Sequence, residues 1–283
     1  MVGTLQNLHI TRLSPYGAFL QGNNTEILLP KKFVDSAMRV GDSVRVFVAF
    51  DSEDRIVATT QIPKLLLGEI GALEIVDSNQ YGYFGDLGID KHLFIPHKAP
   101  KHTMIGKKLV ILLTLDKQGR LIGKLGVREY LRPCRDKRLL RSEAKGLVFE
   151  RTPLGFGCAV DVGVLDSGQK ILHYGLLYAN EVAYTPHIGE NVSVYIKNIR
   201  QDGKIDLSAV TQSESVLLEA LIAHNGRLEL DFKSSPQEIA TLLSMSKKNF
   251  KTLANKLVRD EKAKFIESAV RSGHKALVLV QVL

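Results

Sequence analysis

Two short segments of the chain each place aromatic side chains around a glycine, in a pattern that suits stacking on flat ligands. SPYGAFLQ holds Tyr16 and Phe19, and QYGYFGDL holds Tyr81 and Phe84. Rings on a protein surface stack on the bases of single-stranded nucleic acid, at about 1–3 kcal/mol per base. Side chains three apart in a regular strand point to opposite faces. We therefore expect a bend or bulge at the glycine that turns both rings to one outer face.

An aspartate and an arginine four residues apart follow each aromatic segment. DSEDR holds Asp51 and Arg55, and DKQGR holds Asp116 and Arg120. Both segments are typical of the tight turn of a β-hairpin. An arginine at such a turn reaches a phosphate or stacks on a base, although most exposed Asp–Arg pairs are solvated and contribute little. The aspartate either holds its arginine in place or accepts a hydrogen bond from a base or ribose.

These elements recur in the same order, in copies of about 65 residues. The third copy reads LGFGCAVDV, YGLLYANEV and IGENVSVYIKNIRQDGKIDLS. Each copy is a series of short β-branched runs with strand-type alternation, separated by Gly, Pro or Asp. Five strands in so few residues predict a small closed barrel of the OB type.

The ordered set of motifs resembles the S1-like RNA-binding OB domain. Three such units followed by a helical tail are similar to the conserved virulence factor B family of bacterial RNA-binding regulators, over essentially the whole chain. The resemblance implies that two aromatics, a histidine on the third strand, and the Asp and Arg of the last turn surround the nucleic acid. Pro30 and Pro96 stand at the histidine position in the first two copies, with His97 one residue after Pro96.

The third copy departs furthest from the pattern. It retains Phe156, with Ala159 for the second ring, and has Tyr178 at the histidine position. Arg200 and Lys204 stand at the Asp and Arg positions. The expected RNA-binding residues are therefore Tyr16, Phe19, Arg55, Tyr81, Phe84, Arg120, Phe156, Tyr178 and Lys204, and those of the third copy are the weakest matches.

A basic connector, REYLRPCRDKRLLRSEAK, joins the second copy to the third. Its leucines indicate some helix, starting near Pro133. Such a connector is commonly a solvated linker, but Arg132, Arg135 and Arg138 are candidates for phosphate contacts. The expected units are 1–62, 63–127 and 146–213 as S1-like domains, 128–145 as the basic linker, and 214–283 as a winged-helix domain.

The C-terminal segment changes from strand to helix periodicity. ESVLLEALIAHNG predicts a helix that stops at Gly226. SSPQEIATLLSMS begins with a capping box of Ser235 and Glu238, and SKKNFKTLANKLVRD predicts a basic third helix carrying Lys248 and Lys251. With the short strand RLEL and a final hairpin, this order is typical of a winged helix. Its basic helix either enters the major groove of DNA, as the third helix does in DNA-binding relatives, or presents a solvated face on a protein- or RNA-contacting module.

Composition limits the remaining classes of function. The net charge is +8, and its basic excess lies in 63–127, 128–145 and 214–283, which favours a polyanionic partner. Phosphate-loop, zinc-protease and paired-cysteine motifs are missing from the sequence, so we expect no enzyme activity, metal or cofactor. His92, His97 and His102 are interrupted by prolines and do not share a helical face. With neither a secretion signal nor an apolar run that spans a bilayer, the expected location is the cytoplasm, away from membranes.

The sequence thus predicts a mostly β protein with three tandem S1-like OB barrels and a C-terminal winged helix. The expected function is binding of single-stranded RNA in post-transcriptional regulation, with the ribosome or RNA-processing proteins as further partners. One alternative is a DNA-binding transcription regulator that acts through the helix at 246–259. The other is an adaptor that recruits a nuclease or the ribosome. The oligomeric state and the preferred RNA sequence stay open.

Overall fold

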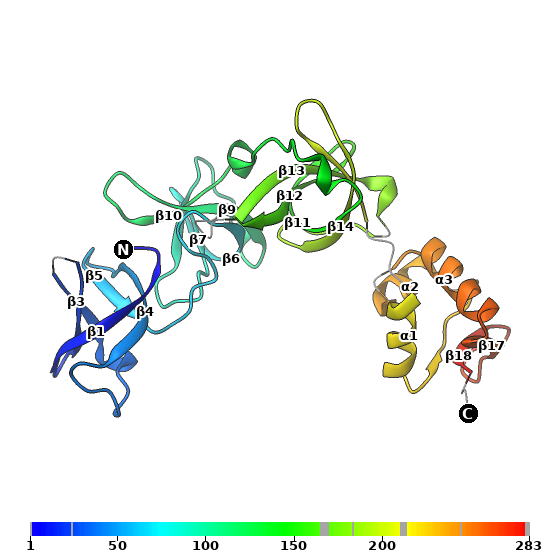
Figure 1. Cartoon of the computed structure of the whole chain (residues 1–283), viewed down its shortest axis with the longest axis horizontal. Coiled ribbons are helices and arrows are strands. Elements are labelled where there is room, and N and C mark those ends of the chain that lie inside the picture. Colours follow the sequence, from blue (N-terminus) through cyan, green and yellow to red (C-terminus); the bar gives the residue numbers. More distant parts are fainter. Residues whose placement is uncertain are drawn as a thin grey trace.

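The computed structural model describes residues 2–23, 25–164, 170–182, 184–209, 214–243 and 245–280. In this part of the chain the strands close three barrels, and a helical unit with a small sheet follows. The four units succeed one another along the long axis, from the N-terminus to the C-terminus (Figure 1). The predicted fold class, three OB-like barrels and a winged helix, is confirmed.

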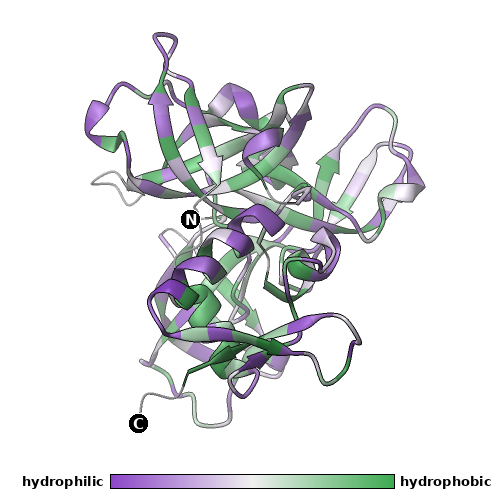
Figure 2. Cartoon of the chain, turned by 90° about the vertical axis from the view of Figure 1, so that its right-hand side faces the viewer, coloured by the Kyte–Doolittle hydropathy of each residue, from purple (hydrophilic) through white to green (hydrophobic). Residues whose placement is uncertain are grey.

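Barrel 1 is closed by five strands in the order β1-β2-β3-β5-β4. They are β1 (Leu5–Ser14), β2 (Gly17–Gln21), β3 (Glu26–Pro30), β4 (Ser43–Phe50) and β5 (Ile56–Thr59). Neighbours are antiparallel except β3 and β5, which run parallel and close the barrel. The apolar residues of these strands, such as Ile10, Leu20 and Val46, fill the interior. Across the whole chain, hydrophilic and hydrophobic residues interleave along the ribbon (Figure 2).

Barrels 2 and 3 repeat this order of strands. Barrel 2 comprises β6 (Ile70–Asn79), β7 (Gly82–Gly85), β8 (Leu93–Pro96), β9 (Lys108–Leu115) and β10 (Leu121–Lys124). Barrel 3 comprises β11 (Glu143–Thr152), β12 (Gly155–Val164), β13 (Lys170–Tyr178), β14 (Asn191–Ile199) and β15 (Ile205–Ala209). Short 3-10 turns lie at Lys31–Phe33, His102–Met104, Val127–Tyr130, Lys137–Leu139 and Ala179–Glu181. The repeated motifs of the sequence therefore mark equivalent places in three equivalent barrels.

Barrels 1 and 2 share apolar packing. Phe47 and Ala49 of β4 are buried in the same cluster as Leu73, Ile75 and Ile95 of barrel 2. Burying apolar area is the main favourable contribution to packing. The end of β4, and the turn that follows it, are thereby held against the second barrel.

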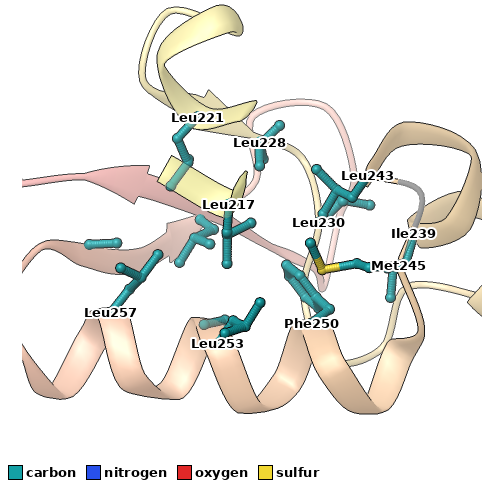
Figure 3. Packing of buried hydrophobic residues seen from close by; sticks show 13 residues of the cluster. Leu217, Leu221, Leu228, Leu230, Ile239, Leu243, Met245, Phe250, Leu253 and Leu257 are labelled. Atoms are coloured by element: carbon teal, nitrogen blue, oxygen red, sulfur yellow. The ribbon is translucent and has the colours of Figure 1, made fainter. Parts of the chain in front are cut away.

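The C-terminal unit consists of three helices and a three-stranded sheet of order β16-β18-β17 within the described residues. Its elements are α1 (Glu214–Ala223), β16 (Arg227–Leu228), α2 (Pro236–Leu243), α3 (Lys247–Arg259), β17 (Ala263–Glu267) and β18 (Lys275–Leu279). Phe250, Leu253 and Leu257 point from α3 into a core with Leu217 and Leu221 of α1 (Figure 3). Residues 210–213, next to the expected boundary of this unit, and 281–283, the end of the expected wing, lie outside the described residues.

The capping box expected before α2 is present. The Glu238 N–H donates to Ser235 Oγ at 3.1 Å, and the Ser235 N–H donates to Glu238 Oε2 at 2.8 Å. Ser246 caps α3 by accepting from the Asn249 N–H at 3.0 Å. These contacts satisfy backbone donors that have no partner inside the helix, which explains where α2 and α3 begin.

A buried carboxylate joins the loop before α2 to the wing. Asp231 accepts the N–H groups of Lys233 and Ser234 at 2.8 and 2.9 Å, and that of Lys275 in β18 at 2.8 Å. Burial opposes ionisation, but these backbone donors outweigh it and lower the pKa of Asp231 to about 2.

We expect Gly17→Ala to destabilise barrel 1 by about 2 kcal/mol or more. Gly17 has φ +146°, and an added Cβ would lie 2.0 Å from the Leu29 carbonyl oxygen. Gly41→Ala is the matched control, because Gly41 also has positive φ, +96°, but an added Cβ meets nothing within 4 Å. Urea unfolding of both variants checks this; equal losses would contradict the role of the close approach.

The Asp231 carboxylate should make the C-terminal unit sensitive to acid. Its folded pKa of about 2 lies below the usual 3.8, so its stabilisation is complete above about pH 5 and is lost as the pH falls through 2. The shift corresponds to about 2 kcal/mol. Asp231→Asn should lower stability at pH 7 and flatten its decline between pH 4 and 2, measured by urea unfolding at a series of pH values. An unchanged pH profile would contradict this.

Candidate nucleic-acid interface

The two tyrosines lie at the tips of hairpin turns. Between β1 and β2, Ser14 Oγ accepts from the Tyr16 N–H at 3.2 Å and donates to the Gly17 carbonyl at 3.0 Å. Between β6 and β7, Asn79 Oδ1 accepts from the Tyr81 N–H at 2.8 Å. Tyr16 is 78% exposed and Tyr81 is 67% exposed. Both rings therefore stand in solvent on turns that a side chain stabilises, as a stacking surface requires.

The bend expected within the strand has a different form. Gly17 is the first residue of β2, and Tyr16 belongs to the turn before it. The irregular register lies in the partner strand, between Ile10 and Arg12. The tyrosine and the phenylalanine therefore come from a turn and a strand, and the separate bulge in β1 was not predicted.

Phe19 is half-buried and already carries a cation on its ring. Arg12, its partner in β1, places its guanidinium 3.4 Å from the ring centroid. Glu26 holds that guanidinium, accepting from Arg12 Nε at 3.0 Å. A hydrogen bond from Thr11, followed by that from Arg12, lowers the pKa of Glu26. Sequence reasoning missed Arg12, although its position opposite Phe19 across the hairpin was a usable signal.

Phe84 lies at the matching position in barrel 2 and pairs with a second ring. Phe94, its partner in β8, has its centroid 5.5 Å away at an interplanar angle of 48°. Such tilted pairs are favourable and hold each ring in place. Phe94 was not among the expected site residues, although HLFIP places an aromatic in the strand that pairs with Phe84.

Each Asp–Arg turn forms the same network. Asp51 accepts the Glu53 and Arg55 N–H groups and Arg55 Nε, all at 2.9 Å. Asp116 accepts the N–H groups of Gln118 and Arg120, together with Arg120 Nε, at the same distances. Burial works against ionisation, but hydrogen bonds from the arginine keep the pKa of both aspartates below the usual range. Of the two roles considered for these aspartates, the geometry supports holding the arginine.

A pocket of about 480 Å³ lies where barrel 1 meets this face of barrel 2. Phe84, Phe94 and Arg120 line it from barrel 2, and Phe50 and Asp54 line it from barrel 1. Asp54 Oδ2 lies 3.5 Å from Arg120 Nη1, and Lys91 Nζ donates to the Asp51 carbonyl at 2.6 Å. The last turn of barrel 1 thus forms one wall of a space beside the phenylalanine pair of barrel 2.

The register of barrel 3 corrects the expected position of its aromatic. Thr152 pairs with Gly155 as Ser14 pairs with Gly17, so Leu154 stands at the position of Tyr16 and Gly157 at that of Phe19. Phe156 takes the inward position and is 7% exposed, within the barrel core. Its ring has no free face for a base, so the interpretation of Phe156 as a stacking residue does not fit this geometry.

Tyr178 and Lys204 are engaged in local contacts. Tyr178 pairs with Gly155 as Pro30 pairs with Gly17, which is the expected position. Its hydroxyl donates to Asp206 Oδ1 at 2.9 Å and accepts from Arg200 Nη2 at 2.7 Å. Hydrogen bonding to Asp206 raises the pKa of Arg200, and Lys204 Nζ lies 2.6 Å from Asp202 Oδ2. Barrel 3 therefore presents a hydrogen-bonded cluster around Tyr178 at the position where barrels 1 and 2 carry Pro30 and Pro96.

The basic connector packs onto barrel 3. Cys134 is buried in the barrel core, and the Arg132 N–H donates to the Leu172 carbonyl at 2.9 Å. The side chains of Arg132, Arg135 and Arg138 are exposed. Hydrogen bonds from Arg138 lower the pKa of Asp136 to about 2. The expected helix is only a 3-10 turn, Lys137–Leu139, and the connector is an anchored basic strip.

The third helix of the C-terminal unit has a basic outer face. Lys248 and Lys251 are exposed, and Lys251 Nζ lies 5.9 Å from the centroid of the Phe232 ring. Among the described residues, no group of His, Cys, Asp and Glu is arranged to hold a metal ion. In the same part of the chain, no helix has the length and apolar character needed to cross a membrane.

Comparison with known proteins agrees with this architecture. Residues 2–61 match the S1 domain, and residues 215–271 match the CvfB-like winged helix domain. YitL of Bacillus subtilis is 25% identical over 276 residues, which cover 92% of this chain and 90% of that protein. Conserved virulence factor B of Staphylococcus aureus (strain N315) is 23% identical over 280 residues, with the same shares covered. The resemblance predicted from the sequence is confirmed.

One solved structure similar to this chain is a multidomain protein with nucleic acid binding domains from Streptococcus pneumoniae TIGR4. It is 21% identical, with a TM-score of 0.44 over 99% of this chain and 98% of that one. The matched S1 and winged-helix domains are of nucleic-acid-binding and regulatory types.

The exposure of the turn tyrosines predicts their chemical reactivity. N-acetylimidazole should acetylate Tyr16 and Tyr81 well before Tyr83, which is 3% exposed and whose hydroxyl accepts the Lys101 N–H at 2.8 Å. Peptide mass spectrometry after brief treatment measures the order. Equal modification of Tyr81 and Tyr83 would show that the turn is not arranged as described.

Proposed function

We propose that this protein binds single-stranded RNA on barrels 1 and 2 and acts in post-transcriptional regulation. The observation that carries the proposal is the repeated pairing, on each of these barrels, of an exposed turn tyrosine with a strand phenylalanine and an arginine held by an aspartate. Ribosomal or RNA-processing proteins are the further partners that such a role would involve.

Stacking supplies affinity without requiring one sequence. Tyr16 and Tyr81 stand free in solvent, and Phe19 and Phe84 lie in strands whose neighbours, Arg12 and Phe94, already contact their rings. Held rings lose little conformational freedom when a base stacks on them. Unpaired bases, with both faces open, suit these rings better than a stacked duplex does.

The arginines supply contacts to the backbone. Arg55 and Arg120 keep about 65% and 43% of their side chains exposed while an aspartate fixes the guanidinium. A guanidinium held in this way donates to phosphate with a defined geometry. Arg132, Arg135 and Arg138 of the connector would extend the basic path toward barrel 3, where Leu154 and Gly157 stand at the positions of Tyr16 and Phe19.

The C-terminal unit favours a second candidate role. Lys248 and Lys251 lie exposed on α3, the third helix of the winged-helix arrangement, which enters the major groove in DNA-binding relatives of this fold. A transcription regulator would bind through this helix, and an adaptor would use it to contact a nuclease or the ribosome. The three candidate functions, RNA-binding protein, transcription regulator and adaptor, predict different effects of substitutions on binding.

Tyr16→Ala combined with Tyr81→Ala should weaken binding of an oligo-RNA by at least tenfold, since each stacked base contributes about 1–3 kcal/mol. Filter binding at two salt concentrations measures this. Arg55→Ala and Arg120→Ala should each reduce the slope of log affinity against log salt by about 0.7, because each removes one phosphate contact.

Tyr184→Ala is the matched control, because Tyr184 is 39% exposed on barrel 3, outside the proposed interface. It should bind RNA like the unmodified protein. A different result would favour the transcription regulator over the proposed RNA-binding protein. In that result the double tyrosine variant keeps full affinity, Lys248→Ala with Lys251→Ala abolishes binding, and the protein prefers duplex DNA to RNA. Retention of a protein partner after nuclease treatment, without RNA binding, would favour the adaptor.

A further inference from the structure

The last turn of barrel 1 differs from its equivalents at one position. Its fourth residue is Asp54, with φ 58°, whereas the same position is Gly119 in barrel 2 and Gly203 in barrel 3, both with φ +79°. Glycine adopts this left-handed conformation without strain, and a residue with a side chain does so at a cost. Barrel 1 therefore accepts a less favourable residue where its side chain reaches barrel 2.

Asp54 supplies an acceptor with remaining capacity inside the pocket. Asp116 also lines the pocket, but its oxygens already accept from two backbone N–H groups and the Arg120 guanidinium. Asp54 keeps 58% of its side chain exposed, and its one ion-pair partner within the described residues is Arg120, at a long 3.5 Å. A carboxylate can accept several hydrogen bonds, so Asp54 has room for a ligand.

The pocket therefore combines apolar rings with one adjacent acceptor and donor. Phe84 and Phe94 form an aromatic wall, Leu121 and Ile122 add apolar surface, and Arg120 presents N–H groups beside the Asp54 carboxylate. Its volume of about 480 Å³ lies within the range of about 300–1,000 Å³ that small-ligand sites occupy. A single planar heterocycle with a donor-rich edge matches this chemistry.

We propose that the pocket between barrels 1 and 2 selects guanine, with Asp54 accepting from its N1–H and N2–H groups and Arg120 donating to O6 from Nη1, the nitrogen that faces Asp54. The second N–H of Arg120 Nη2, which also contacts Asp116, stays available for phosphate. Guanine is the RNA base that presents two adjacent N–H donors next to a carbonyl on its pairing edge. Adenine and cytosine present one amino group beside an acceptor, and uracil presents one N–H between two carbonyls. The inference rests on the proposed binding of RNA, and it makes barrels 1 and 2 a single recognition unit.

The test compares oligo-uridine strands that carry one central guanosine, inosine or adenosine. Inosine keeps O6 and N1–H but lacks the amino group. The guanosine strand should bind about tenfold tighter than the adenosine strand, which is the size of one good two-point base contact, and the inosine strand should fall between them. Fluorescence anisotropy at fixed salt measures all three.

Asp54→Gly should abolish the guanosine preference while leaving the fold intact, because glycine already occupies this turn position in the other two barrels. Affinity for the guanosine strand should fall to that of the adenosine strand, whereas affinity for the adenosine strand should stay equal or rise, since a negative charge is removed. Glu53→Gln is the control for charge in the same turn, and it should keep the preference, because Glu53 does not line the pocket.

Two negative results are distinguishable. Binding of all three strands without a guanosine preference, or a preference that survives Asp54→Gly, overturns this inference and leaves the proposed function standing. Failure to bind any strand overturns both.

Discussion

The apolar contact between barrels 1 and 2 is the constraint on which the candidate interface depends. Phe47 is fully buried, and it shares a cluster with Leu73 and Ile95 of barrel 2. Because β4 runs directly from this contact into the turn at Asp51–Arg55, the packing of β4 also places the turn beside the second barrel. Exposed polar contacts at the edge of this packing, such as the hydrogen bond from Lys91 to the Asp51 carbonyl, individually contribute little stability. They orient a turn whose position is set mainly by the apolar packing.

The three barrels show how one framework can keep its fold while its surface chemistry changes. The strand order and the parallel closing pair are the same in all three. The inward residues stay apolar, whereas the outward position of Phe19 and Phe84 becomes Gly157 in barrel 3. An added Cβ at Gly157 would lie 2.5 Å from the Glu150 side chain, so a polar neighbour already occupies the space that a ring would need.

Much of the architecture followed from the sequence, because the signals are local. Alternation, turn residues and the capping box at Ser235 identified the strands and the starts of helices. The Asp–Arg turns were also found correctly, because a four-residue spacing within one turn fixes their geometry. These features need no knowledge of distant parts of the chain.

The parts that sequence reasoning missed depend on register and on packing between units. Phe156 was matched by its neighbouring glycine, but two glycines, Gly155 and Gly157, flank it, and only the pairing with β11 shows which one is equivalent to Gly17. A slip of one residue exchanges the two faces of a strand, so the choice of glycine determines whether a ring is core or surface.

Contacts between barrels could not be predicted from the sequence, because residues such as Asp54 and Arg120 are 66 positions apart in the chain. Their meeting depends on how two barrels pack, which the repeat pattern of either one does not contain. Each barrel alone offers aromatic rings that can stack on any base. Where the two barrels meet, the carboxylate of one lies beside the guanidinium of the next, and this pair adds a hydrogen-bond acceptor and donor with defined directions. Selectivity in such a protein can therefore arise at the junction of repeats, even where the repeats themselves discriminate little.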